Sequence, residues 1–219
     1  MGSREGNMSQ QAHRSDPRIL NRRTLRRDHR YLAGILRPGM SVLDVGCGTG
    51  AITADIARAV GPHGSVLGVD RDEANLTGAI DHYGGLEGLR FETLDILSLG
   101  DHYNDTFDIV TAARTLQWIS EPQLAIRNLK KAAKQGGSVV VLDYNLDETR
   151  WEPEPPPNFR RFYQVFLDWR KFNGWDNQMA SHLTSLFHSE GLVDVVSHPS
   201  NELIRRGDPD FLDAYASGI

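Results

Sequence analysis

The sequence predicts an α/β protein built on a doubly wound, mostly parallel sheet. Short apolar segments of strand character alternate with segments whose apolar residues recur at helical spacing. Breakers rich in glycine and proline separate these segments. A glycine loop, residues 46–50, directly follows the first apolar strand segment. Strands that alternate with helices favour parallel pairing, with helices on both faces of the sheet.

The elements are expected in the following order. A first amphipathic helix spans about residues 19–36, where leucines and a histidine recur at helical spacing, and the Arg-Pro-Gly sequence at 37–39 ends it. The strands expected after it are the apolar segments 41–45, 65–70, 89–93, 107–112, 138–143 and 192–197. The helices expected between them are 52–60, 73–83, 122–133 and 179–190. Each of these helices is followed by glycine, at positions 61, 84, 136 and 191.

An aromatic segment interrupts this alternation after the proline-rich stretch 152–157. Its aromatic residues recur at helical spacing and are Phe159, Phe162, Tyr163, Phe166, Trp169 and Phe172. Such a stripe either packs as core against a neighbouring element or lines a substrate pocket. We expect a disordered leader, 1–18, followed by one domain, 19–219. That domain comprises an N-terminal helix (19–37), a cofactor-binding core (38–145), an aromatic lid insertion (151–176) and the C-terminal part of the sheet (177–219).

Composition and charge exclude several classes of protein. The 219 residues are 39% hydrophobic and 24% charged, which is typical of a globular chain rather than a disordered, collagenous or coiled-coil one. The longest apolar run, 139–142, is too short to cross a membrane, and the first residues lack a long apolar stretch, so we expect no secretory signal there. The single cysteine, Cys47, permits no internal disulfide and no cysteine zinc site, and it indicates a reducing, cytoplasmic compartment.

Basic residues gather at the beginning of the chain. Residues 1–30 hold eight arginines and three acids, whereas the remainder has 16 basic and 26 acidic residues and a net charge of −10. An acidic body does not suit a protein that covers a phosphate backbone. The basic segment is compatible with a solvated surface helix, a cover over an anionic site, a nucleic-acid arm, a membrane-surface helix or a transit peptide.

The glycine loop marks the expected ligand site, because ligands of open α/β sheets bind beyond the carboxyl ends of the strands. Glycines there allow a tight turn and let a ligand approach the backbone. By itself the loop does not distinguish a nicotinamide cofactor from other nucleotides. Three carboxylates do: Asp44 beside the loop, Asp70 after the second strand and Asp95 after the third. Together they favour a nucleoside that carries positive charge, and S-adenosylmethionine fits that description.

These residues carry a resemblance to a known family. The segment 42–50, Val-Leu-Asp-Val-Gly-Cys-Gly-Thr-Gly, is similar to the signature loop of class I S-adenosylmethionine-dependent methyltransferases, and segments 68–70, 94–97 and 107–110 fall where that family has its next strand motifs. The segment 113–119 resembles the ubiquinone/menaquinone-biosynthesis and trans-aconitate methyltransferase branch. The resemblance covers about residues 30–145. It implies a seven-stranded, Rossmann-like sheet, although no final antiparallel strand is apparent before residue 219.

The resemblance also implies roles for individual residues. Asp44, Gly46 and Gly48 would surround the methionine end of the cofactor, with backbone from Cys47. Asp70 would bind the ribose, Arg71 would lie against the adenine, Asp95 would accept from the adenine amine, and the Ile96 N–H would donate to the ring. Ala113 and Arg114 would face the methionine, where many relatives carry a small polar residue at about position 113. S-adenosylhomocysteine would be the product.

The same residues have plainer interpretations. Asp44 and Asp70 are each able to brace a turn, and Cys47 is more readily a small residue in a crowded turn than a nucleophile. Trp118 either lines the substrate pocket or packs against the following helix. The histidines 29, 82 and 102 show no metal-ligand spacing, so we expect no metal site.

The resemblance implies in-line displacement by a small-molecule acceptor, with a general base needed only if the acceptor must lose a proton. No catalytic residue is assigned. Carboxylate acceptors would need cationic anchors, which arginines 23, 26, 27, 30, 114 and 160 would supply. The substrate candidates are Arg30, Trp118, Arg160 and Tyr163. We expect the first helix and segment 151–176 to form a lid over the cofactor, and the protein to be a monomer or homodimer.

Three rival functions are kept. A nicotinamide-dependent oxidoreductase leaves Asp44 and Asp95 unexplained. A nucleic-acid methyltransferase would carry an Asn/Asp-Pro-Pro-aromatic sequence after the fourth strand, where this chain has Thr-Ala-Ala-Arg at 111–114. A non-catalytic binding protein with the methyltransferase fold is excluded by no feature of the sequence.

Overall fold

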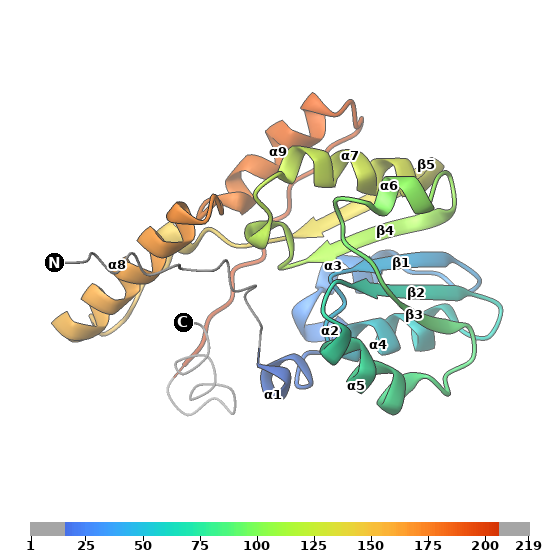
Figure 1. Cartoon of the computed structure of the whole chain (residues 1–219), viewed down its shortest axis with the longest axis horizontal. Helices are drawn as coiled ribbons and strands as arrows, with labels where there is room; N and C mark the ends of the chain where they lie inside the picture. Colours follow the sequence, from blue (N-terminus) through green and yellow to red (C-terminus); the bar gives the residue numbers. More distant parts are fainter. Residues whose placement is uncertain (1–15, 206–219) are drawn as a thin grey trace, which may run out of the picture.

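The computed structural model describes residues 16–205, whose centre is one parallel sheet with the strand order β3-β2-β1-β4-β5 (Figure 1). The strands are β1 (Ser41–Val45), β2 (Ser65–Asp70), β3 (Leu89–Thr93), β4 (Phe107–Ala113) and β5 (Ala133–Leu142). The strand order reverses between β1 and β4, so the crevice beyond their carboxyl ends is the expected place for a ligand. The predicted doubly wound α/β fold is confirmed.

Helices cover both faces of the sheet. They are α1 (Pro17–Leu20), α2 (Leu25–Asp28), α3 (Arg30–Ile35), α4 (Ala51–Val60), α5 (Glu73–Tyr83), α6 (Leu99–His102), α7 (Pro122–Ala132), α8 (Pro157–Phe172) and α9 (Met179–Ser189), with 3₁₀ turns η1 (Leu116–Trp118) and η2 (Leu146–Glu148). Figure 1 shows α6, α7 and α9 on one face and α3, α4 and α5 on the other.

The core lies in two layers, one on each face of the sheet. In β1, Leu43 packs with the layer that contains Ile126 and Leu129 of α7, whereas Val42 packs with the layer that contains Leu32 of α3 and Ile56 of α4. Neighbouring residues of a strand point to opposite faces, which explains why the central strands are apolar at almost every position. Burying each such side chain stabilises the fold by roughly 1.5–3 kcal/mol.

The predicted helix over 19–36 is wrong in its continuity, since the chain forms three short helices there. Local side-chain caps compete with a continuous helix. The Thr24 hydroxyl accepts the Arg27 N–H over 3.4 Å, and the Asp28 carboxylate accepts the Thr24 N–H over 2.7 Å. His29 then leaves the helical region with a φ of −146°, and its ring contacts the Thr111 hydroxyl at 2.9 Å.

The end of the sheet also differs from the expectation. Residues 192–197 form no strand, and Asp194 there adopts a positive φ of 53°, which interrupts an extended run. Within residues 16–205, β5 is therefore an edge strand. It begins at residue 133 rather than 138 and includes Gly136 and Gly137, with a register irregularity opposite residues 107–109. Most of the predicted leader 1–18 lies outside the described residues, although residues 17 and 18 belong to α1.

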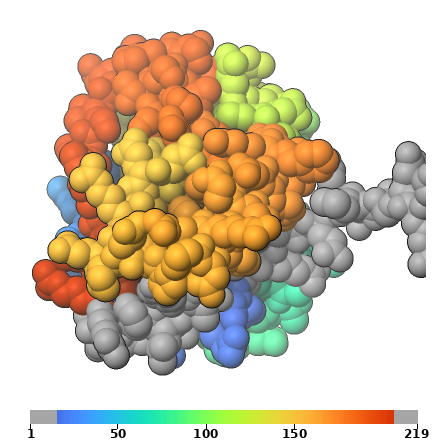
Figure 2. All heavy atoms as spheres, turned by 90° about the vertical axis from the view of Figure 1, so that its left-hand side faces the viewer, coloured from blue at the N-terminus to red at the C-terminus, as the bar shows by residue number. Residues whose placement is uncertain are grey.

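The aromatic segment forms α8, which extends from the end of the sheet where the strands terminate (Figure 1). Figure 2, turned to face that end, shows the segment in front of the body. Its stripe is no ordinary core, because Phe162 and Phe172 are exposed and the only buried α8 residues are Leu167 and Arg170. Across residues 16–205, no helix combines the length and the apolar character needed to cross a membrane.

Candidate functional site

The glycine loop between β1 and α4 is shaped by left-handed backbone and by close packing. Gly46 and Gly48 have φ values of 73° and 55°, which favour glycine. The Gly46 N–H donates to the Val69 carbonyl over 2.8 Å, which holds the loop against β2. A β-carbon on Gly46 would overlap the Thr115 side chain. The loop therefore requires glycine at position 46 for both conformation and space.

Asp70, at the end of β2, braces this loop. Its Oδ2 accepts the Gly48 N–H over 2.8 Å, and its Oδ1 accepts the Asp72 N–H over 2.9 Å. Each carboxylate oxygen has a second lone pair, so the group retains acceptor capacity toward a ligand. The bracing and the ligand-binding interpretations of Asp70 are thus compatible.

Asp44 lies buried in β1 beneath the loop. The Thr53 hydroxyl donates to its Oδ2 over 2.7 Å. Burial raises the pKa of Asp44 to about 6; the Thr53 hydrogen bond opposes this rise and the nearby Asp70 carboxylate adds to it. A cationic group placed beside Asp44 would favour its ionised form.

Asp95 and Ile96 follow β3. The Asp95 Oδ1 accepts the Leu97 N–H over 2.8 Å, so this carboxylate shapes its own turn. The Ile96 carbonyl accepts a hydrogen bond from the Asn128 amide over 2.9 Å. No acceptor among the described residues lies within hydrogen-bonding distance of the Ile96 N–H, although Ile96 itself is buried. This donor is available to a ligand.

These elements enclose a pocket of about 670 Å³ at the carboxyl ends of β1, β2 and β4, here called the strand-end pocket. All ten predicted cofactor-binding residues line it: Asp44, Gly46, Cys47, Gly48, Asp70, Arg71, Asp95, Ile96, Ala113 and Arg114. Trp118 lines it too. The wall also includes four residues that were not predicted, Leu20, Thr49, Ile52 and Glu73, and their adjacency to the motifs was the available signal.

The structure separates the other substrate candidates from this pocket. Arg30 lines a second, larger hollow, bounded by β5, α9 and residues 190–204 and here called the outer hollow. Arg160 and Tyr163 of α8 line neither cavity. Arg160 pairs with Glu154, and the Tyr163 hydroxyl donates to the Leu146 carbonyl over 2.8 Å. Of the two predicted lid elements, the N-terminal one reaches the pocket, through Leu20 and Arg23, and α8 does not.

A buried arginine connects α8 to the pocket wall. Arg170 is fully buried, and its guanidinium carbon lies 4.2 Å from the centre of the Trp118 ring. Its Nη2 donates to the Gln117 carbonyl over 2.7 Å and its Nε to the Asn177 side chain over 2.7 Å. Burial lowers the pKa of Arg170 to about 10, and the Asp143 carboxylate opposes that shift. Trp118 therefore both lines the pocket and packs against a helix from another part of the chain.

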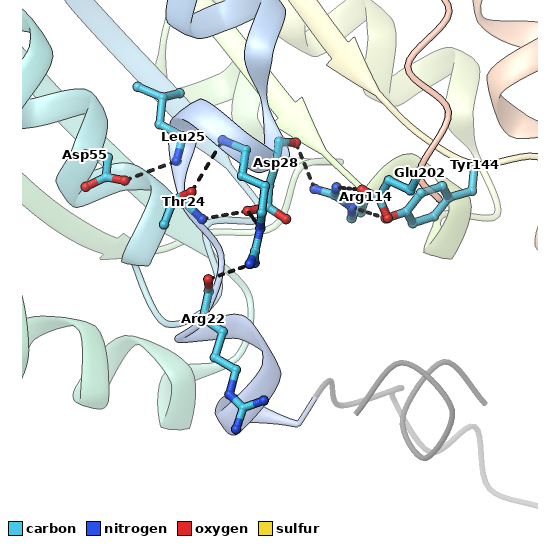
Figure 3. Close-up of polar contacts among 9 residues, drawn as sticks. Arg22, Thr24, Leu25, Asp28, Asp55, Arg114, Tyr144 and Glu202 are labelled. Atoms are coloured by element: carbon cyan, nitrogen blue, oxygen red, sulfur yellow. Dashed lines mark hydrogen bonds and ion pairs between the residues drawn. The ribbon is translucent and has the colours of Figure 1, made fainter. Parts of the chain in front are cut away.

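Arg114 is the most constrained cation at the pocket. It has a positive φ of 58°, uncommon for a residue with a side chain, and it is buried. Its guanidinium donates to the Tyr144 hydroxyl and the Glu202 carboxylate, and its Nη1 lies 3.3 Å from the Asp28 carbonyl (Figure 3). Burial alone would lower the pKa of Arg114, but Tyr144 and Glu202 outweigh burial and raise it.

Two further groups lack the properties of catalysts. Burial, with the charges of Asp44 and Asp70, raises the pKa of the Cys47 thiol well above its ordinary value, so it stays protonated at neutral pH. Burial, with the charge of Arg114, lowers the pKa of His29 to about 4 and leaves the imidazole neutral. The described residues include no cluster of three or more His, Cys, Asp or Glu side chains able to hold a metal ion.

Family comparison gives the site its context. The family model described as a methyltransferase domain matches residues 36–182, well over half of the chain. The chain belongs to the methyltransferase domain family. The resemblance inferred from the glycine loop and the three acids is thereby confirmed, and the strand-end pocket of this methyltransferase-family chain lies at the site where its fold class binds ligands.

The curated relatives match a little over half of the chain. Ubiquinone/menaquinone biosynthesis C-methyltransferase UbiE from Burkholderia vietnamiensis is 34% identical over 121 residues, which are 54% of this chain and 47% of that protein. The UbiE protein from Burkholderia mallei is 34% identical over 134 residues, covering 60% and 51%. The chain thus spans about half the length of the curated relatives it matches.

Solved structures agree in fold. A SAM-dependent methyltransferase from Aquifex aeolicus aligns with a TM-score of 0.60 at 21% identity, covering 81% of this chain and 89% of that one. An arsenic (III) S-adenosylmethionine methyltransferase from Chlamydomonas reinhardtii aligns with a TM-score of 0.54 at 24% identity, covering 70% and 52%. At these identities the likeness establishes the Rossmann-like fold of the methyltransferase family.

Proposed function

We propose that this protein transfers a methyl group from S-adenosylmethionine to a small-molecule acceptor. One observation carries the proposal: the strand-end pocket gathers the glycine loop and the carboxylates of Asp44, Asp70 and Asp95. The cofactor supplies a methyl group already activated by a positively charged sulfur. Membership of the methyltransferase domain family and the UbiE relatives support this assignment.

The donors and acceptors of the pocket fit that cofactor. The buried, unpartnered Ile96 N–H suits an adenine ring nitrogen, and Asp95 beside it suits the exocyclic amine. Asp70 retains lone pairs for the ribose hydroxyls while it holds the loop. Asp44 lies under the loop, where a carboxylate favours a cationic ligand and disfavours a pyrophosphate.

The remaining wall serves the acceptor. Ala113 and Arg114, which the resemblance places toward the methionine end of the cofactor, continue the pocket at and beyond the end of β4 together with Trp118. Their task is to hold the acceptor's nucleophilic atom aligned with the methyl group and to exclude water. No described residue is assigned as a general base: neither Cys47 of the pocket nor His29, which lines the outer hollow, has a suitable pKa.

A small acceptor is favoured over a nucleic acid, since residues 31–219 carry a net charge of −10. We also infer a cytoplasmic location from the single cysteine.

Titration calorimetry with S-adenosylhomocysteine and with NAD tests the proposal. We expect S-adenosylhomocysteine to bind with a 1:1 stoichiometry and NAD to show no heat of binding. If NAD binds and S-adenosylhomocysteine does not, the result would favour a nicotinamide-dependent oxidoreductase instead. A second assay supplies labelled methyl donor with a panel of acids, phenols, amines and oligonucleotides. If S-adenosylhomocysteine binds but no member of the panel is methylated, a non-catalytic binding protein would be favoured.

A further inference from the structure

Two arginines from distant parts of the chain stand where the two cavities meet. Arg23, between α1 and α2, and Arg114, after β4, each line both the strand-end pocket and the outer hollow. Both residues therefore lie between the strand-end pocket and the outer hollow. This position suits contact with the acceptor better than contact with the cofactor.

Arg114 is held in place by its backbone and by the Tyr144 ring, and Glu202 covers its charge. Its left-handed backbone follows directly from β4, and its N–H donates to the Leu142 carbonyl of β5. A left-handed conformation at a residue with a side chain costs of order 1–3 kcal/mol, which the fold maintains here. Tyr144, stacked at 5.2 Å from the guanidinium carbon, fixes the side chain from one side.

Glu202 is the carboxylate on this arginine. Figure 3 shows its carboxylate facing Arg114 and Tyr144. The Tyr144 hydroxyl donates to Glu202 Oε2 over 3.0 Å, and Arg114 donates to Oε1. The Glu202 side chain is 42% exposed and lies in a segment with no regular secondary structure, so little packing opposes its departure.

Arg23 shares the same environment. Its backbone N–H donates to the Leu20 carbonyl over 3.2 Å, but its guanidinium makes no hydrogen bond or ion pair with a described residue. It is half-buried, and burial together with the charge of Arg114 lowers its pKa. The charges of Asp28 and Glu202 partly oppose this lowering, but the Glu202 carboxylate is in contact with Arg114 rather than with Arg23. A half-buried cation without a partner costs free energy that a second carboxylate would recover.

Resting on the function proposed above, we propose that Arg23 and Arg114 bind a carboxylate of an anionic methyl acceptor, and that Glu202 occupies this place until the acceptor displaces it. The planar guanidinium group of arginine can donate two parallel hydrogen bonds to a carboxylate, whereas a neutral acceptor would leave Arg23 without an anionic partner. Glu202 acts as an internal competitor, because its carboxylate makes with Arg114 and Tyr144 the contacts that the acceptor's carboxylate would make.

Calorimetry on the full chain saturated with S-adenosylhomocysteine tests this proposal. The probes are benzoate and citrate, with benzamide as the neutral analogue of benzoate. We expect at least one carboxylate probe to bind, and benzamide to bind about tenfold more weakly or not at all, because hydrogen bonds to charged groups contribute about 1.5–3 kcal/mol.

Three variants separate the site from general charge effects. Arg23→Gln should weaken the binding of the carboxylate probe by about tenfold. Arg26→Gln is the matched control. Arg26 was among the arginines predicted as possible anchors, but it is exposed and lines neither cavity, so its substitution should leave the affinity within about twofold. Glu202→Gln should tighten binding by about tenfold, because the competing carboxylate is removed.

The outcomes distinguish this inference from the function on which it rests. Failure of the unmodified protein to bind S-adenosylhomocysteine would defeat the proposed function. If the protein binds S-adenosylhomocysteine normally, the proposed function stands and the anion site is tested separately. Three results would overturn the anion site: no binding of either carboxylate probe, equal binding of benzoate and benzamide, or weaker binding of the carboxylate probe by Glu202→Gln. Equal losses in Arg23→Gln and Arg26→Gln would also overturn it.

Discussion

The Gly48 N–H donates to the Asp70 carboxylate over 2.8 Å, and this hydrogen bond joins the glycine loop to the end of β2. One side chain thereby shapes the loop and presents acceptor oxygens to the pocket that the loop borders. The geometry of the loop and the affinity of the pocket for a nucleoside are therefore coupled through Asp70.

We expect Asp70→Asn to weaken S-adenosylhomocysteine binding by about 10- to 100-fold, since the amide replaces one acceptor by a donor and removes the charge. Calorimetry measures the loss. Asp81→Asn is the control, because Asp81 is an exposed acid of α5 outside the pocket and its loss changes the net charge equally. Unchanged affinity in Asp70→Asn would remove the ribose-binding role.

Gly46→Ala should destabilise the protein by about 2–4 kcal/mol, because left-handed backbone disfavours a side chain and the new β-carbon would overlap Thr115. Gly39→Ala is a matched control: its φ is 85°, yet a β-carbon there would meet no atom within 4 Å. It should cost only about 1 kcal/mol. Urea denaturation measures both values, and equal losses would mean that overlap with Thr115 contributes nothing.

The residues predicted from sequence to bind the cofactor line one pocket because they lie in short motifs on parallel strands. Once the order of strands and helices is known, the carboxyl ends of β1, β2 and β4 must meet at one edge, and their motifs converge there. The ten residues lining the pocket were therefore accessible from spacing and resemblance. Their individual contacts with a cofactor stay predictions.

The features that sequence did not predict depend on contacts between distant segments. The helix expected over 19–36 is divided because Thr24 caps a new helix and the His29 ring contacts Thr111. The spacing of apolar residues indicates neither contact. The pairing of Arg114 with Glu202 crosses 88 residues, and no local pattern indicates it. The aromatic stripe of α8 was visible in the sequence, but the buried Arg170 within it was not.

Binding of the cofactor product should depend on pH through Asp44. Its pKa is raised to about 6 in the free protein, and an ammonium group beside it would favour the ionised form. Protonation of Asp44 below pH 6 therefore competes with binding. We expect the affinity for S-adenosylhomocysteine to fall by about tenfold from pH 7 to pH 5 and to be level above pH 7.

Calorimetry between pH 5 and pH 8 measures this dependence, with Asp44→Asn as the test variant. The amide does not titrate in this range, so its binding should be weaker at pH 7 and nearly independent of pH. Asp81→Asn should retain the pH dependence of the unmodified protein. A pH profile in Asp44→Asn that still falls below pH 6 would assign the titration to another group.

Replacing the buried arginine of α8 should loosen the attachment of that helix to the pocket wall. Arg170→Met keeps much of the side-chain volume but leaves the Gln117 carbonyl and the Asn177 amide oxygen without their donor. Each unsatisfied buried acceptor costs about 1–3 kcal/mol, so we expect a loss of roughly 2–4 kcal/mol in urea denaturation. Tryptophan emission should also shift, because Trp118 loses the cation stacked on its ring.

The control is Arg161→Met, which removes an exposed arginine from the same helix and should change stability by no more than about 0.5 kcal/mol. Burial raises the pKa of Asp143 to about 7, and the Arg114 charge is among the groups that oppose this rise. The Asp143 carboxylate also stabilises the charged form of Arg170. Because this attraction is mutual, we expect Asp143 to be protonated more readily when Arg170 is absent. The loss of stability in Arg170→Met should therefore be smaller at pH 6 than at pH 8. A loss equal to that of Arg161→Met at both pH values would show that Arg170 does not secure α8.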